Sequence, residues 1–151
     1  MKWLEKYRLG FDIWGMLLFL LVMLPNFFWF AVPAPNDVLR MDSTTPIIDT
    51  IASVCQVLMV ACLCFVINKS RSSLHFSPLV ISTAVCVVFY YGGWLLYYGG
   101  FASTLVILML TIPPCLAFIL FAADRKNIPA VLFAIVFAVC HLIFSIVNCL
   151  T

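Results

Sequence analysis

Residues 24–33 read Leu-Pro-Asn-Phe-Phe-Trp-Phe-Ala-Val-Pro, at the end of a long apolar segment. Pro25 has no N–H to donate within a helix, and its ring clashes with the preceding turn. The amide of Asn26 costs free energy wherever it lies against lipid without a hydrogen-bond partner. The stretch therefore predicts a first membrane helix that breaks near Pro25 and leads into a polar mouth at Asp37.

The composition of the chain indicates that lipid is its solvent. Of its 151 residues, 66% are hydrophobic and only 9% are charged, whereas soluble domains carry about 25% charged residues. The net charge is +2 and no basic run exists outside short loops, which argues against nucleic acid as a partner. We therefore expect an integral membrane protein whose partners include membrane lipids.

Five apolar segments are each long enough to cross a hydrocarbon core of about 30 Å, which takes roughly 20 helical residues. Two of them start with a capping residue followed by proline, at Thr45-Pro46 and Ser77-Pro78, a pattern typical of helix N-termini. The sequence predicts an all-α bundle of five transmembrane helices that forms a single domain over residues 1–151, with spans at about 9–33, 46–67, 78–98, 101–122 and 128–149.

The N-terminal residues have two possible interpretations. Trp3, Tyr7, Phe11 and Trp14 recur at helical spacing, which fits a helix whose aromatic rings lie at a membrane interface. A basic start before an apolar run is also typical of a signal peptide. We reject that second interpretation because the run over 9–32 is too long and no A-x-A cleavage site follows it.

The basic residues indicate the orientation. Cytoplasmic loops carry an excess of Lys and Arg. A cytoplasmic N-terminus places seven basic residues inside and only Arg40 outside, the seven being Lys2, Lys6, Arg8, Lys69, Arg71, Arg125 and Lys126. The sequence predicts a multi-pass protein of the bacterial plasma (inner) membrane with its N-terminus cytoplasmic and its C-terminus external.

Polar residues form short stripes inside two of the predicted helices. Asp49, Ser53 and Gln56 are spaced i, i+4, i+7, and so are His141, Ser145 and Asn148; this spacing places each set on one helix face. At a rise of 1.5 Å per residue, Asn26, Gln56 and His141 lie roughly 10–15 Å below the outer surface, and Tyr90, Tyr91 and Thr111 lie at about the same depth.

Polar groups at one depth in five helices predict a polar pocket, because intramembrane ionisable residues generally face the bundle interior or a wet cavity. The expected ligand-binding residues are Asn26, Asp49, Ser53, Gln56, Tyr90, Thr111, His141, Ser145 and Asn148. The alternative is that these side chains only hydrogen-bond across packed helices and tie them together.

No catalytic or metal-binding signature is present, and we expect no cofactor. There is no phosphate-binding glycine loop, no H-E-x-x-H and no G-x-S-x-G. The seven Cys all lie in apolar segments, where free Cys behaves as a small hydrophobic residue. Cys62 and Cys64 point to different helix faces, so their spacing does not suit a metal site.

The stretches 24–30 and 111–116 read Leu-Pro-Asn-Phe-Phe-Trp-Phe and Thr-Ile-Pro-Pro-Cys-Leu. With them the chain resembles small uncharacterised multi-pass bacterial inner-membrane proteins, a resemblance that implies a membrane location and no activity. Its size is also similar to that of the tryptophan-rich sensory/translocator proteins, which bind porphyrins and sterols. Their W-x-P-P pattern is missing, since Trp29 is followed by Phe-Ala-Val-Pro.

These observations favour a small membrane protein whose outward-facing polar pocket binds or moves a small or amphiphilic ligand. One alternative is a non-catalytic membrane subunit or assembly partner, which includes a homo-oligomer. A second is an intramembrane enzyme on a lipid-linked substrate, with His141 and Asp49 as the acid–base pair. A non-enzymatic role is favoured because no nucleophile and base lie close together in the sequence.

Overall fold

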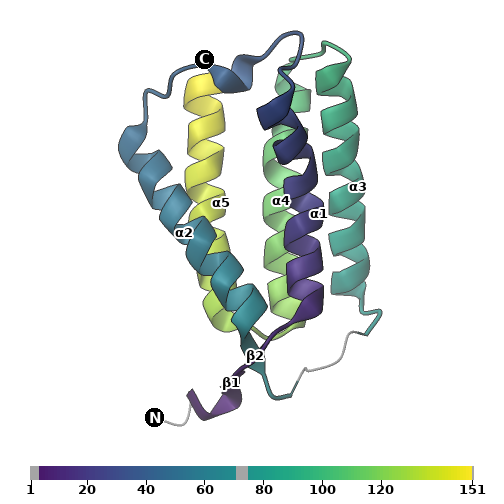
Figure 1. Cartoon of the computed structure of the whole chain (residues 1–151), viewed down its shortest axis with the longest axis vertical. Helices are drawn as coiled ribbons and strands as arrows, with labels where there is room; N and C mark the ends of the chain where they lie inside the picture. The colour runs from purple at the N-terminus through teal and green to yellow at the C-terminus, as the bar shows by residue number, and fades with distance from the viewer. Residues whose placement is uncertain (1–3, 71–74, 151) are drawn as a thin grey trace.

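The computed structural model describes residues 4–70 and 75–150, so Lys2, Trp3 and Arg71 lie outside the described residues. Five helices stand side by side: α1 (Ile13–Ala31), α2 (Pro46–Phe65), α3 (Pro78–Tyr98), α4 (Thr104–Asp124) and α5 (Ile128–Cys149) (Figure 1). All five are long and apolar enough to cross a membrane. The predicted all-helical bundle of five such helices is therefore confirmed.

The N-terminal stretch differs from its prediction. After a short 3-10 helix, η1 (Leu4–Lys6), the chain forms strand β1 (Tyr7–Leu9), which pairs antiparallel with β2 (Val66–Asn68) directly after α2. The expected helical stripe is thus wrong at Tyr7 and Phe11, and only Trp14 is helical, because α1 begins four residues after Leu9, at Ile13. The backbone contact continues beyond the strand pair, because the Asp12 N–H donates to the Cys64 carbonyl near the end of α2 at 2.8 Å.

Helix caps account for most of the observed helix starts. The carboxylate of Asp12 accepts from the Trp14 and Gly15 amides at 3.0 and 3.4 Å, and the side chains of Ser77 and Asn127 cap α3 and α5 in the same way. Thr45 precedes Pro46 as predicted, but its side chain makes no cap hydrogen bond.

The predicted break at Pro25 is wrong, because α1 is helical from Ile13 to Ala31. The missing Pro25 N–H leaves the Leu21 carbonyl without its helical donor, and the Tyr91 hydroxyl of α3 donates to that oxygen at 2.8 Å. A side-chain hydroxyl from the neighbouring helix therefore replaces the backbone donor that Pro25 lacks. The pair Pro113-Pro114 likewise lies inside an uninterrupted α4.

The helix α4 is the centre of the bundle. Of the residues in its membrane-spanning part 56% are buried, against 17–28% in the other four helices. α3 and α5 each pack along α4, and α2 packs along α5. α1 makes fewer contacts with its neighbours, which leaves room beside it.

We call the end of the bundle that carries β1 and β2 the strand end. A cluster of buried polar residues, which we call the polar clamp, joins the chain segments that meet there. It consists of Asp12, Asn68, Arg125 and Asn127. Arg125 Nη2 donates to Asp12 Oδ2 at 2.6 Å, and both side chains are buried. Asn127 donates to the Cys62 and Val66 carbonyls at 2.8 Å, and Asn68 to the Lys126 carbonyl at 3.0 Å.

The helices α1 and α2 also approach most closely at the strand end. A Cβ atom added to Gly15 would lie 2.7 Å from the backbone oxygen of Leu63, closer than a Cβ atom comes to another heavy atom in real proteins. From there α2 tilts away from α1 toward the opposite end, the loop end, where residues 32–45 connect the two helices (Figure 1).

Candidate ligand-binding site

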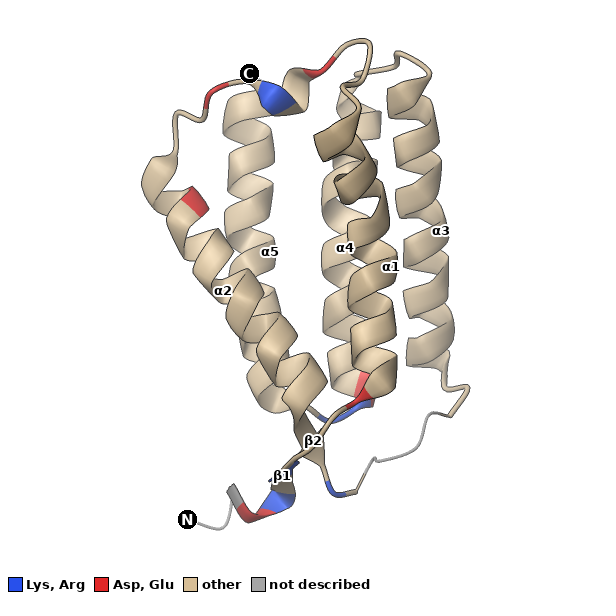
Figure 2. Ribbon diagram, in the orientation of Figure 1, with Lys and Arg blue, Asp and Glu red and all other residues tan. Residues whose placement is uncertain are grey.

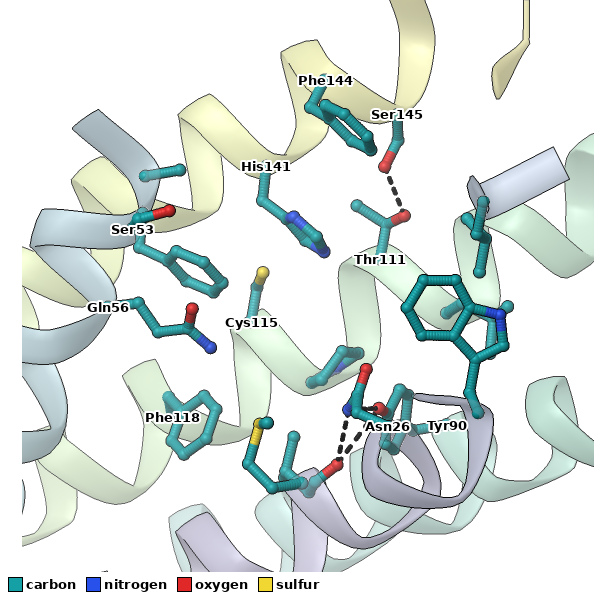
Figure 3. Close-up of a pocket in the computed structure, with 18 of the residues that line it drawn as sticks. Asn26, Ser53, Gln56, Tyr90, Thr111, Cys115, Phe118, His141, Phe144 and Ser145 are labelled. Atoms are coloured by element: carbon teal, nitrogen blue, oxygen red, sulfur yellow. Dashed lines mark hydrogen bonds between the residues drawn. The ribbon is translucent and has the colours of Figure 1, made fainter. Parts of the chain in front are cut away.

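A cavity of about 420 Å³ lies inside the half of the bundle near the loop end, and all five helices contribute to its lining (Figure 3). Its size lies within the range of about 300–1,000 Å³ that is usual for small-molecule sites. Eight of the nine expected ligand-binding residues line it: Asn26, Asp49, Ser53, Gln56, Tyr90, Thr111, His141 and Ser145.

The cavity opens toward the side of the bundle. Among its lining residues only Phe30 of α1 and Ser53 of α2 are exposed. The opening therefore lies between the two helices that diverge toward the loop end. Leu39 of the connecting loop also contributes to the lining, so this loop closes part of the upper boundary.

Four of the lining residues join helices to one another. Asn26 Nδ2 of α1 donates to the Tyr90 hydroxyl of α3 at 2.6 Å. The Thr111 and Ser145 hydroxyls, on α4 and α5, are hydrogen-bonded at 2.7 Å (Figure 3). These pairs match the predicted alternative in which polar groups tie helices together.

Two polar side chains in the cavity have no such partner. Within the described part of the chain, neither the Gln56 amide nor the His141 imidazole makes a hydrogen bond, although both point into the cavity (Figure 3). The His141 ring stacks on Phe137 and Phe144 of its own helix, with centroids 5.2 and 6.4 Å away. Buried polar groups usually have a partner, so these two are available to a ligand or to water.

Asp49 adds a carboxylate to the α2 side of the cavity, to which Gln56 also belongs. It accepts a hydrogen bond from the Thr45 hydroxyl at 3.2 Å, and its backbone carbonyl accepts one from the Ser53 hydroxyl at 2.8 Å. No Lys or Arg of the described chain forms a salt bridge with it. The α2 stripe of Asp49, Ser53 and Gln56 therefore presents polar oxygens to the cavity.

Asn148 is the one expected residue that does not line the cavity. Its side chain accepts from the Thr44 amide and hydroxyl at 2.7 and 2.8 Å and donates to the Thr45 hydroxyl at 2.9 Å. It thereby joins the end of α5 to the start of α2. The i+7 spacing from His141 indicated the helix face but not the distance from the cavity.

Sequence reasoning missed most of the aromatic wall of the cavity. Six aromatic rings line it in addition to the expected groups: Trp29, Phe30, Trp94, Phe118, Phe137 and Phe144. The indole N–H of Trp94 is buried and has no hydrogen-bond partner among the described residues. A signal was present, because Trp94 follows Tyr90 by four residues and so shares its helix face.

A second missed cluster fixes the connecting loop above the cavity. Asp37 Oδ1 accepts from the Trp29 indole and the Tyr97 hydroxyl, each at 2.9 Å, and Oδ2 from Arg40 Nε at 2.7 Å. Burial alone would raise the pKa of the Asp37 carboxyl, but these bonds and one from the Ala34 amide outweigh it. The pKa of Asp37 therefore lies below its ordinary value of 3.8.

No three His, Cys, Asp or Glu side chains come together as a metal site in residues 4–70 and 75–150. Compared with known protein families, with curated proteins and with solved structures, the chain gives no significant match. The functional argument therefore depends on the residues and geometry of the cavity.

Proposed function

We propose that the chain is a multi-pass protein of the bacterial plasma membrane whose cavity binds a small amphiphilic ligand from the outer half of the bilayer. The observation that carries the binding proposal is the cavity itself. The Gln56 and His141 side chains point into it without a hydrogen-bond partner among the described residues (Figure 3), and Asp49 lines it without a salt bridge to any described residue. An apolar wall with a few convergent polar groups is the usual composition of a small-molecule site.

The distribution of charge supports the proposed orientation. The basic residues of the described chain gather at the strand end, except for Arg40 at the loop end (Figure 2). Since cytoplasmic loops are enriched in Lys and Arg, the strand end with the N-terminus is assigned to the cytoplasm. The cavity then lies in the outer half of the membrane, with its opening between α1 and α2 toward the lipid.

The orientation can be tested with reporter fusions after the last residue of the chain. Alkaline phosphatase folds only after export, so a C-terminal fusion to it is expected to be active, and a fusion to green fluorescent protein is expected to be dark. The opposite pattern would contradict the orientation and would move the cavity to the inner leaflet.

Binding can be tested with three compounds that share one apolar body: 4-phenylbutylamine, 4-phenylbutanol and 4-phenylbutyrate. Equilibrium dialysis of the purified protein in dodecyl maltoside, with empty micelles as the blank, measures saturable binding. We expect at least one compound to bind the wild type and to lose binding in Ala52→Phe, which fills the cavity from a buried lining position. The control is Ala61→Phe on the exposed face of the same helix.

A second variant keeps the test decisive if Ala52→Phe does not fold. His141→Ala removes no hydrogen bond within the described chain, so its helical circular dichroism and elution volume should match those of the wild type while binding weakens. If no compound binds the wild type, or if both variants bind like the wild type, the proposed function is wrong. A role as a tightly packed membrane subunit would then be the better account.

A further inference from the structure

We propose that the cavity selects organic cations, that is, ligands with an amine on an apolar, aromatic-sized body. This inference rests on the proposed function and adds the charge of the ligand to it. It follows from the groups that line the cavity, and above all from Asp49, which, unlike Asp12 and Asp37, forms no salt bridge among the described residues.

The first observation is that two other acids are neutralised within the chain. Asp12 is paired with Arg125 at 2.6 Å, and Asp37 with Arg40 at 2.7 Å. Each arginine lies close enough for a charge-assisted hydrogen bond, the stronger kind. At both of these sites an arginine of the chain itself balances the negative charge of the aspartate.

Asp49 is treated differently. It lines the cavity together with the titratable groups His141, Tyr90 and Cys115, and no Lys or Arg belongs to the lining. Arg40 lies near the upper boundary, where its guanidinium is 4.7 Å from the Trp29 ring centroid, but its charge is already paired with Asp37. A ligand that enters the cavity therefore meets one carboxylate without a counter-ion.

The neutral lining groups also suit a cation. The Gln56 amide oxygen and an unprotonated nitrogen of the His141 imidazole can each accept a hydrogen bond from an ammonium group, and neither side chain has a hydrogen-bond partner within the described chain. The Ser53 hydroxyl donates its proton to the Asp49 carbonyl at 2.8 Å, so its oxygen is left to accept. Along the α2 face the cavity thus offers acceptors in addition to the N–H donors of Gln56, and the Asp49 carboxylate is what favours a cation.

The aromatic wall adds a second attraction for positive charge. A cation over an aromatic face is attracted to the ring quadrupole, and the attraction grows when the cation is desolvated. Trp94, Phe137 and Phe144 line the cavity beside the polar stripe. An anion would meet Asp49 and these ring faces with no compensating charge, and a neutral ligand would leave the carboxylate unpaired. The geometry therefore disfavours both.

The test compares the three phenylbutyl compounds, which differ only in their charged or neutral head group. We expect 4-phenylbutylamine to bind at least tenfold more tightly than 4-phenylbutanol, and 4-phenylbutyrate to bind most weakly. Asp49→Asn should reduce the affinity for the amine at least tenfold and leave that for the alcohol within twofold. Asp42→Asn removes an exposed acid of the loop just before α2 that does not line the cavity, so it should change nothing.

Asp49→Glu keeps the charge and should keep the preference for the amine, which covers the case in which Asp49→Asn does not fold. If the alcohol binds saturably and the amine binds no better, the cation inference is overturned while the proposed function stands. The same holds if Asp49→Asn lowers the affinities for amine and alcohol equally. If none of the three compounds binds, the proposed function fails and this inference fails with it.

Discussion

At the strand end, buried charges and amides are paired within the protein, whereas in the other half several polar side chains face a cavity without partners. Arg125 and Asp12 neutralise each other at 2.6 Å, and Asn127 and Asn68 donate to backbone oxygens. In the cavity, by contrast, Gln56 and His141 make no hydrogen bond in the part of the chain that the structure describes.

The difference follows from how the helices diverge. At Gly15, α1 and α2 are so close that a side chain would collide with the Leu63 backbone, and toward the loop end α2 tilts away (Figure 1). A bundle that is joined at one end and splayed at the other can keep a stable fold and an open cavity together. The tightly packed contact and the open cavity therefore lie at different ends of the same helices.

The largest predicted effect comes from breaking the polar clamp. Arg125→Leu leaves the buried Asp12 carboxylate without its counter-ion, and removing one partner of a buried ion pair costs about 3–5 kcal/mol. We expect a loss of this size in the free energy of unfolding in detergent. The double variant Asp12→Asn/Arg125→Leu should recover part of it, because asparagine can still cap α1. A loss below about 1 kcal/mol, the usual worth of an exposed pair, would show that the clamp is unimportant.

The close approach of α1 and α2 gives the next effect. Gly15→Ala forces a Cβ atom to 2.7 Å from the Leu63 carbonyl oxygen, and overpacking of this kind costs about 1–3 kcal/mol. The matched control is Gly92→Ala, whose new Cβ would find its nearest neighbour, Met109, at 3.7 Å. That control should be neutral or stabilising by up to about 1 kcal/mol, since alanine is the better helix former. Equal unfolding free energies for the two variants would contradict the close approach.

The smallest effect concerns the loop above the cavity and depends on pH. Asp37→Asn should cost about 1 kcal/mol near neutral pH, because hydrogen bonds to a charged group are lost or weakened. The folded-state pKa of Asp37 lies below 3.8, so the stabilisation is fully present above that value and is lost as pH falls through the lower folded-state pKa. Thermal unfolding of both proteins from pH 7 to pH 2.5 measures the difference. A difference that stays constant down to the lowest pH would rule out the carboxylate as its source.

The sequence predicted the helices well because their signals are local. Long apolar runs with Pro46, Pro78 and Pro129 at or near their starts are sufficient to locate helices. The shared depth of Asn26, Gln56 and His141 also follows from the helical rise alone, and these three residues do line one cavity.

What the sequence could not predict depends on contacts between distant residues. The Asp12–Arg125 pair spans 113 positions, and no periodicity connects such residues. The Tyr91 hydroxyl that repairs α1 at Pro25 comes from another helix, so a proline that reads as a break sits in a continuous helix. Helical spacing indicates which residues share a face, but only the packing decides which of them are paired, as Asn26 is, and which face the cavity unpaired, as His141 does.

The central claim, that the splayed half of the bundle holds a site for an amphiphilic amine, is tested most directly by photolabelling. A diazirine analogue of 4-phenylbutylamine is activated in membranes that contain the protein, and the labelled residues are identified by mass spectrometry. We predict labels within residues 49–56 of α2 and 137–145 of α5, and we predict that excess 4-phenylbutylamine prevents them. Labels that excess amine does not reduce, or that fall on outward-facing residues such as Val88 and Leu95, which are 70% and 77% exposed, would contradict the account.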